Sequence, residues 1–238
     1  IFSFKKLMIN FDIERDLYNK NIVMIGVDEA GRGSWAGPLV STACWFDFTK
    51  YKSLHSDIND SKKLKSSKRS EIILSLKNFV KYSSSIASVK EIDKYGLSYA
   101  NAISMKRSIF SLTQVLKKKP QIYRKKNFCI YLDGKFKPDL KNLDNFLQLK
   151  KLHLENFSVE TLVKGDSFCK TIALASIISK ETRDNIMKQL SKKHPSYFFE
   201  SHFGYGTKNH KNSILKNGIL DLHRKSFKPI ATICSKKI

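Results

Sequence analysis

The chain has 238 residues, of which 41% are hydrophobic, enough for one sizeable domain with a buried core. Lys and Arg total 44 against 21 Asp and Glu, and the resulting net charge of +23 favours a polyanionic partner, although a Lys-rich compositional bias explains the same excess. No apolar run reaches the roughly 18 residues that span a bilayer, so no membrane segment is expected.

Strand-like and helix-like segments alternate in the first half of the chain. The apolar run 22–27 predicts a buried strand that stops at Asp28 and Glu29, and 39–46 predicts a second strand after a Gly-rich turn. Apolar residues at helical spacing predict an amphipathic helix over about 66–81. A third strand is expected at 84–89 and a further helix over about 98–118.

The second half begins with a strand over 128–132 that runs into Asp133, followed by another at 159–163. A long helix is predicted over about 167–191. Strands first, interleaved helices and a helical C-terminal third predict an α/β domain. We expect residues 1–20 to be an N-terminal extension, 21–230 one domain that includes the C-terminal helices, and 231–238 a tail. The basic stretch 117–126 is expected to be an exposed loop within that domain.

The four cysteines argue against a zinc ribbon and against a disulfide scaffold. They lie far apart with no C-x-x-C spacing, at Cys44, Cys129, Cys169 and Cys234. Three of them lie in apolar runs, where we expect buried thiols. A reducing cytoplasm is the compartment that this usage predicts.

Two apolar strands each end in a carboxylate, at Asp28-Glu29 and at Asp133. Ligand sites of α/β sheets gather at strand ends, so the three acids meet in one cleft if these strands are neighbours. Such a cluster is expected to hold a hard divalent cation. The alternative is that each acid caps a turn or an adjoining helix.

A fourth acid must be chosen between Asp166 and Asp184, which lie about 27 Å apart along an unbroken helix and therefore cannot share one ion. Asp166 stands at the predicted N-cap of the long helix and suits the edge of a site, so we choose it. Asp184 follows Arg183 on the helix body, where a structural ion pair is expected.

The turn at Gly31-Arg32-Gly33 follows the first two acids directly. Adjacent strand residues point to opposite faces, so Glu29 is expected where the strand breaks into this turn. The glycines permit close approach of another chain, and Arg32 can grip a phosphate. A plain tight turn explains an isolated G-R-G equally well.

Several segments resemble, in order, the signature blocks of the type II ribonucleases H. They are GVDEAGRG at 26–33 with AGP at 36–38, DSKKL at 60–64, LDG at 132–134, KGD at 164–166 with 173–180 and 183–184, GYGT at 204–207 with His210, and HRKSF at 223–227. The matches run from about residue 22 to 229, and their order makes the set much more specific than any single block.

The resemblance implies a ribonuclease H-like mixed sheet flanked by helices, with a C-terminal helical extension. It implies an endonuclease that cuts the RNA strand of RNA–DNA hybrids and nicks 5′ of single ribonucleotides in duplex DNA. It assigns the catalytic and metal-binding roles to Asp28, Glu29, Asp133 and Asp166, with Mg²⁺ or Mn²⁺ as the cofactor.

The same resemblance assigns recognition of the ribonucleotide 2′-OH to the backbone of Gly31, Arg32 and Gly33, and stacking on the junction sugar to Tyr205. Without the surrounding motif, Tyr205 could equally be an ordinary aromatic. Three lysines are candidate phosphate contacts, with solvation as an equal interpretation: Lys62, Lys63 and Lys164.

Three rival interpretations remain. A type III ribonuclease H shares the chemistry, but that family carries an extra N-terminal domain and usually has Lys where Arg32 stands. A non-catalytic duplex-binding module would explain the charge, and a DNA-only nuclease would explain the acids. We expect a cytoplasmic monomer, and the sequence assigns no contact to a sliding clamp.

Overall fold

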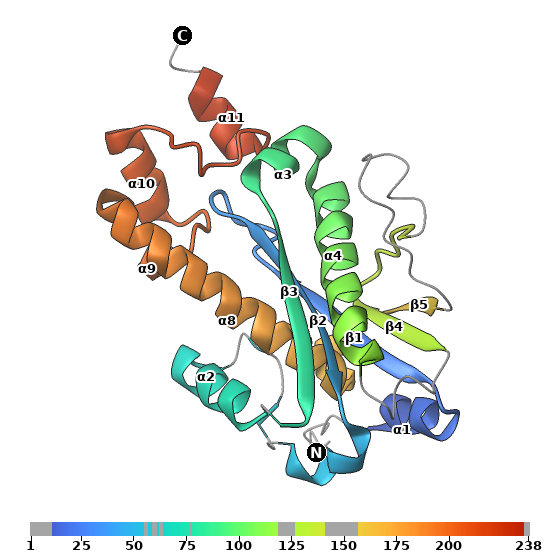
Figure 1. Ribbon diagram of the computed structural model, residues 1–238. Coiled ribbons are helices and arrows are strands. Elements are labelled where there is room, and N and C mark those ends of the chain that lie inside the picture. Colours follow the sequence, from blue (N-terminus) through green and yellow to red (C-terminus); the bar gives the residue numbers. More distant parts are fainter. Residues whose placement is uncertain are drawn as a thin grey trace, which may run out of the picture.

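The computed structural model describes residues 11–54, 57–58, 61, 64–76, 78–118, 127–140 and 157–235. A five-stranded mixed sheet lies at its centre, in the order β3-β2-β1-β4-β5 (Figure 1). The strands are β1 Val23–Ala30, β2 Leu39–Phe46, β3 Val80–Ala87, β4 Phe128–Asp133 and β5 Phe157–Leu162. Strands β1, β2 and β3 pair antiparallel, whereas β4 runs parallel to both β1 and β5. The predicted ribonuclease H-like mixed sheet is confirmed.

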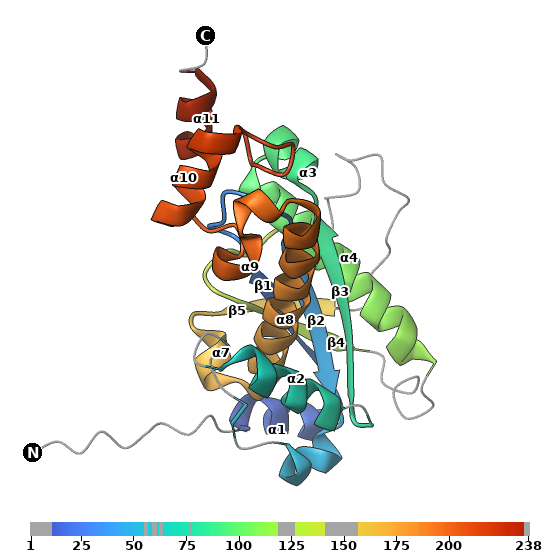
Figure 2. The same cartoon turned by 90° about the vertical axis from the view of Figure 1, so that its left-hand side faces the viewer.

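Helices cover both faces of the sheet, and the last ones gather beyond one end of it (Figure 1, Figure 2). The α-helices are α1 Asp12–Asn19, α2 Ser66–Ser75, α3 Val89–Tyr95, α4 Leu97–Lys117, α7 Gly165–Phe168, α8 Lys170–Lys193, α9 Phe199–His202, α10 Lys208–Asn217 and α11 Lys228–Ser235. Two 3₁₀ helices are η1 Phe48–Ser53 and η3 Pro195–Tyr197. No helix in the described ranges is long and apolar enough to cross a membrane.

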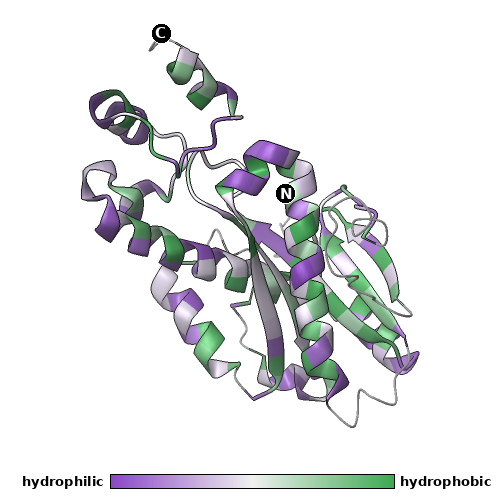
Figure 3. Cartoon of the chain, turned by 45° about the horizontal axis from the view of Figure 1, so that its top comes forward, coloured by the Kyte–Doolittle hydropathy of each residue, from purple (hydrophilic) through white to green (hydrophobic). Residues whose placement is uncertain are grey.

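The two faces of β1 belong to two different cores, because successive strand residues point in opposite directions. Val23, Ile25 and Val27 pack with the apolar side of α4. Met24 packs with residues that begin α8, on the other face. Along both α4 and α8, hydrophobic and hydrophilic residues alternate around the helix, as Figure 3 shows. This division decides which way the acids at the end of β1 point.

Helix α8 lies directly against the backbone of β1 at Gly26. A Cβ atom at that position would lie 2.6 Å from the carbonyl carbon of Thr171. Only glycine therefore permits this approach, and the rest of α8 is placed beside the end of β1.

Helix α1 falls within the predicted N-terminal extension and is joined to the domain through a buried carboxylate. Glu14 is 3% exposed, and its Oε1 accepts the amide N–H of Thr171 at 3.0 Å and the Thr171 hydroxyl at 3.0 Å. This carboxylate satisfies a backbone donor of the first turn of α8, where negative charge is favourable.

Several element bounds differ from the sequence predictions. Helix α2 ends at Ser75 rather than near 81, because the chain turns there into β3, which begins at Val80. Residues from Val89 form α3, whose Ser88 and Glu91 make a reciprocal N-terminal cap that the strand prediction overlooked. The long helix predicted from 167 is broken: Cys169 has extended backbone angles between α7 and α8. The basic stretch 119–126 lies outside the described residues.

The cysteine prediction is confirmed. All four are free thiols, and Cys44, Cys129 and Cys169 are buried.

Candidate active site

Asp28 and Asp133 lie side by side at the ends of adjacent parallel strands. The register pairs Val27 with Leu132, so the two aspartates are the next residues along, on the face that α8 covers. Asp28 is 6% exposed, and its Oδ1 accepts the Glu29 amide at 2.7 Å. The predicted meeting of these two strand ends is therefore confirmed.

The backbone position of Glu29 differs from the sequence prediction. Strand β1 does not break at Glu29 but continues to Ala30, and Glu29 pairs with Ser41 of β2. By alternation its side chain starts from the face that α4 covers, opposite to that of Asp28. Its carboxylate still enters the same cleft because both residues lie at the open end of the strand.

The cleft has a volume of about 490 Å³. Its walls come from residues 31–38 between β1 and β2 (the first loop), the ends of β1 and β4, one side of α8, and the loop between α9 and α10 that contains Tyr205. The lining residues are Asp28, Glu29, Ala30, Gly31, Arg32, Gly33, Ser61, Asp133, Ser176, Ser179, Lys180 and Tyr205. Seven residues of the proposed site therefore line one cavity. Five of them lie before residue 100 in the sequence, and two lie after it.

Burial and mutual repulsion act on the acids. Burial, followed by the charges of Glu29 and Asp133, raises the pKa of Asp28 well above its ordinary value. Burial also raises the pKa of Glu29, while Arg32 and the Asn101 amide oppose that rise. The Arg32 guanidinium lies 3.3 Å from Glu29 Oε1, but its side chain is 47% exposed and compensates the cluster only partly.

The proposed fourth acid lies beside this group but does not line the cleft. Asp166 is in α7, is 8% exposed, and is not the N-cap of the long helix, because that position is Cys169. Its neighbour Gly165 donates its amide N–H to Asp133 Oδ1 at 2.6 Å. The start of α7 is therefore bound to the third acid, and the metal-binding role of Asp166 stays a prediction.

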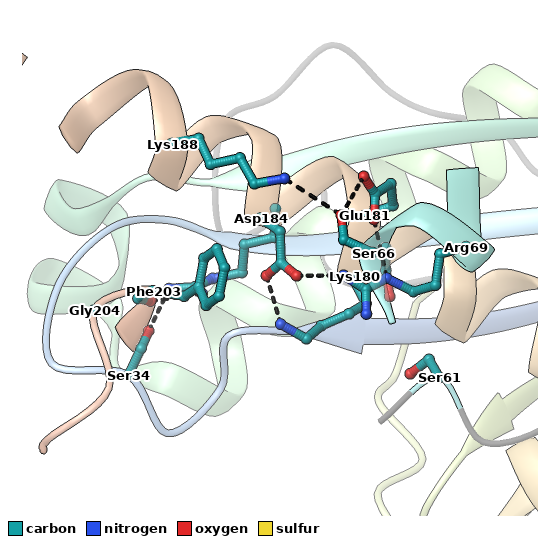
Figure 4. Close-up of polar contacts among 12 residues, drawn as sticks. Ser34, Ser61, Ser66, Arg69, Lys180, Glu181, Asp184, Lys188, Phe203 and Gly204 are labelled. Atoms are coloured by element: carbon teal, nitrogen blue, oxygen red, sulfur yellow. Dashed lines mark hydrogen bonds and ion pairs between the residues drawn. The ribbon is translucent and has the colours of Figure 1, made fainter. Parts of the chain in front are cut away.

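Asp184, the alternative fourth acid, makes ion pairs within the structure. Asp184 Oδ2 accepts from Arg69 at 2.6 Å, and Asp184 also pairs with Lys180 (Figure 4). It is 1% exposed and makes the predicted structural ion pair. The argument from an unbroken helix was wrong in its premise, since the helix breaks at Cys169.

Arg183 stabilises the first loop through hydrogen bonds. It is 1% exposed and donates to the carbonyls of Pro38 and Phe203, each at 2.9 Å, and to the hydroxyl of Ser34 at 2.7 Å. Gly31, with φ of +90°, lies on this guanidinium: a Cβ there would lie 1.9 Å from Nε. The glycine that the sequence singled out is thus required by both its conformation and its contact.

Tyr205 lines the same cleft as the Gly31–Gly33 turn and is 36% exposed. The Arg183 guanidinium lies 5.4 Å from the centre of its ring, within the range of a cation–π contact. Its backbone carbonyl faces Nδ1 of the buried His210 at 3.0 Å. Arg183 therefore connects the two parts of the proposed substrate-reading surface.

A second buried arginine supports the same loop. Arg224 donates to the carbonyl of Gly37 at 3.0 Å and to that of Arg32 at 2.9 Å. Burial lowers its pKa to about 9. Trp35, whose contacts the sequence could not assign, packs over Gly206 and lies 5.8 Å from the His210 ring.

Sequence reasoning missed the wall that α8 supplies. Ser176, Ser179 and Lys180 line the cleft, and Ser176 lies 2.9 Å from the hydroxyl of Ser61. The helical spacing of these residues with Arg183 was the available signal, because residues three or four apart share one helix face. Of the predicted phosphate contacts, Lys164 is exposed, and Lys62 and Lys63 lie outside the described residues.

The donor set of the cleft fits a hard divalent cation. Asp28, Glu29 and Asp133 offer carboxylate oxygens, the ligands that Mg²⁺ and Mn²⁺ prefer. Burial, together with the charge of neighbouring acids, raises the pKa of Asp28 and of Glu29, and a bound cation would favour their charged forms. In the part of the chain that is described, no three such groups have the spacing of a preformed metal site.

The chain is similar to known ribonucleases. The family model for ribonuclease HII matches residues 25–230. The ribonuclease HII of Wolbachia pipientis wMel is 36% identical over 209 residues, covering 88% of this chain and 91% of that protein.

Two solved structures share the fold. Ribonuclease H2 from Pyrococcus horikoshii OT3 superposes with a TM-score of 0.69 at 24% identity, covering 90% of this chain and 98% of that one. Bst-RNase HIII, solved in complex with Mn²⁺, has a TM-score of 0.66 at 18% identity, covering 91% of this chain and 70% of that one. On the strength of the family model and the curated relative, this chain belongs to the ribonuclease HII family of endonucleolytic ribonucleases H.

Proposed function

We propose that this protein cuts the RNA strand of RNA–DNA hybrids and also nicks duplex DNA on the 5′ side of a single embedded ribonucleotide. The observation that carries the proposal is the position of three acids at neighbouring strand ends directly beneath the Gly31–Gly33 loop. Tyr205 lines the same cleft, which can hold one sugar–phosphate junction.

In this proposal, Asp28, Glu29 and Asp133 bind divalent cations together with Asp166 at the edge of the site. Bound there, two cations would supply an activated water and stabilise the leaving 3′ oxygen, so that the products are 5′-phosphate and 3′-hydroxyl ends. The fold neighbour solved with Mn²⁺ supports this class of ion, and either Mg²⁺ or Mn²⁺ fits the oxygen donors.

The neighbouring side chains position the substrate. Arg32 is half exposed at the mouth of the cleft, where its guanidinium can grip a phosphate and exchange its pairing with Glu29. The backbone of Gly31, Arg32 and Gly33 is the proposed reader of the 2′-OH, the group that distinguishes RNA from DNA at one position. Tyr205 would stack on the junction sugar. Exposed Lys164 is proposed to contact the phosphate backbone, as are Lys62 and Lys63.

Cleavage of three end-labelled duplexes tests the proposal, with Mg²⁺, with Mn²⁺ and with a chelator. One duplex is all DNA, one carries a single ribonucleotide, and one is a full RNA–DNA hybrid. We expect metal-dependent cleavage of the hybrid and a nick on the 5′ side of the lone ribonucleotide. Cleavage of the hybrid alone would indicate the specificity of type III enzymes, and cleavage of none by folded protein would overturn the proposal.

A further inference from the structure

Three polar side chains are buried together in the largely apolar layer between α4 and the sheet. They are Ser41 of β2 and Asn101 and Ser104 of α4, and each is 0% exposed. Their neighbours on the same helix, such as Ala102 and Ile103, belong to the hydrophobic core. Burying polar groups costs free energy unless they are paired, so this cluster calls for an explanation beyond packing.

In this cluster the side-chain oxygen of Asn101 lies toward Ser41. The Ser41 hydroxyl donates to Asn101 Oδ1 at 3.1 Å, and Ser104 Oγ lies 2.6 Å from Ser41 Oγ. Ser104 also donates to the backbone carbonyl of Asn101 at 2.9 Å. Because the side-chain oxygen is held toward Ser41, the Nδ2 group is turned to the other side.

The Glu29 carboxylate lies on that other side of Asn101. Ser41 is the cross-strand partner of Glu29, so both side chains start from the face that α4 covers. The Asn101 amide acts on the carboxylate closely enough to lower the pKa of Glu29. Within the described residues, however, neither Asn101 Nδ2 nor Glu29 Oε2 completes a hydrogen bond of standard geometry. A buried donor and a buried acceptor thus face each other with no other partner.

The two oxygens of Glu29 therefore have different surroundings. Oε1 lies 3.3 Å from the half-exposed Arg32 at the cleft, while Oε2 is fully enclosed. An amide that attracts Oε2 inward leaves Oε1 directed at the cavity that Asp28 and Asp133 also line.

We propose that Asn101, held by Ser41, is a positioning residue that orients the Glu29 carboxylate for cation binding. Asn101 does not touch the cation or the substrate and acts only through Glu29. The inference rests on the proposed function, since it assumes that Glu29 is a ligand. Groups that hydrogen-bond to metal ligands typically change metal affinity by about 10- to 100-fold when they are removed.

The test is titration calorimetry of Mn²⁺ into the full chain, for wild type, Asn101→Ala, Ser41→Ala and a control. The control is Ser108→Ala, because Ser108 is also 0% exposed on α4, and among the described residues its hydroxyl bonds only to the Met105 carbonyl of its own helix. We expect Asn101→Ala to bind Mn²⁺ about 10-fold or more weakly. Ser41→Ala should show a smaller loss, and Ser108→Ala none.

Cleavage assays add a second readout. The Mn²⁺ concentration for half-maximal cleavage should rise for Asn101→Ala, and the rate at saturating Mn²⁺ should recover, which a general loss of packing would not produce. Thermal denaturation in chelator shows whether each variant is folded; if Asn101→Ala is not, Ser41→Ala decides.

Unchanged Mn²⁺ affinity in the folded variants, with a wild type that binds and cleaves, would overturn this inference alone. A wild type that binds no Mn²⁺ would overturn both it and the proposed function.

Discussion

Two groups of buried acids lie along α8, and they differ in what faces them. In the cleft, Asp28, Glu29 and Asp133 lie close together, and Glu29 is paired with the half-exposed Arg32. Two turns further along the helix, Arg69 lies between Glu181 at 3.0 Å and Asp184 at 2.6 Å, with its side chain 5% exposed (Figure 4).

The second group is closed on all sides. Glu181 also accepts hydrogen bonds from the hydroxyls of Ser66 and Ser70, both at 3.1 Å, and Asp184 pairs with Lys180. A buried acid with a buried counter-charge holds elements together, here α2 and α8. A buried acid among other acids stores repulsion that a ligand can relieve. The buried counter-charge of Arg69, rather than burial itself, identifies the second group as a structural support.

The largest expected effect comes from removing an acid of the cleft. Asp133→Asn should lower cleavage of the ribonucleotide-containing duplex by more than about a hundredfold, as loss of an electrostatic group at the reaction centre does. Folding and duplex binding should stay close to wild type because the amide keeps the shape of the side chain. Single-turnover cleavage and a gel-shift assay measure the two. Retained turnover would remove Asp133 from the site.

The same substitution in the paired group should instead cost stability. Asp184→Asn leaves the buried Arg69 with Glu181 alone, and we expect a loss of about 3 kcal/mol, at the low end for a broken buried pair. For a chain of this size this corresponds to a melting temperature lower by roughly 6–12 °C. Scanning calorimetry measures it, and a melting temperature equal to that of wild type would mean that the two groups do not differ as described.

The glycines of the first loop should differ from each other in stability. Gly31→Ala places a Cβ on Arg183 at a positive φ, and we expect a loss of about 1–3 kcal/mol from the backbone strain alone. At Gly33 a Cβ would meet nothing within 4 Å, so Gly33→Ala should change stability by less than about 0.5 kcal/mol. Urea denaturation of the two variants compares them directly, and equal stabilities would contradict the role of Arg183 beneath the loop.

The smallest expected effect is an increase in thermal stability. The pKa of Asp28 is raised in the folded state, so the folded chain holds this proton more tightly than the unfolded chain does. Stability is therefore lost as the pH rises through the raised pKa. Asp28→Asn removes this penalty and should raise the melting temperature in chelator by a few degrees, about 2–4 °C for each kcal/mol relieved.

The pH dependence of this increase in melting temperature serves as the control for Asp28→Asn. The increase should be present at pH 8 and fade as the pH falls below about 4, where the carboxyl becomes protonated in both states. A gain that does not depend on pH would point to packing instead of charge.

The features that the sequence predicted correctly depend on short local patterns of residues. The run 39–46 is β2 with the predicted bounds, and the acids at the ends of β1 and β4 stand together because apolar strands ending in carboxylates are recognisable from a few residues. The roles of Gly31 and Tyr205 came from a resemblance, and the structure adds the contacts with Arg183 that connect them.

What the sequence could not predict depends on residues far apart in the chain. The break of the long helix at Cys169 goes with Glu14, which binds the amide of Thr171 from across the sequence. Asn101 reads as an ordinary polar residue of an amphipathic helix until the register places Ser41 opposite Glu29. Nothing local reveals that Arg69 and Asp184 are partners.

The contact between Glu14 and Thr171 also has a consequence for synthesis on the ribosome. The two residues are 157 positions apart, so the first helix is made long before its partner exists. At about 5–20 residues per second, that delay is roughly 8–30 s. Pairing of β1 with β4 must wait for most of that time as well. The nascent N-terminal half therefore leaves the ribosome with the β1 edge that pairs with β4 still uncovered, and the sheet is complete only after β5, which ends at Leu162, has been made.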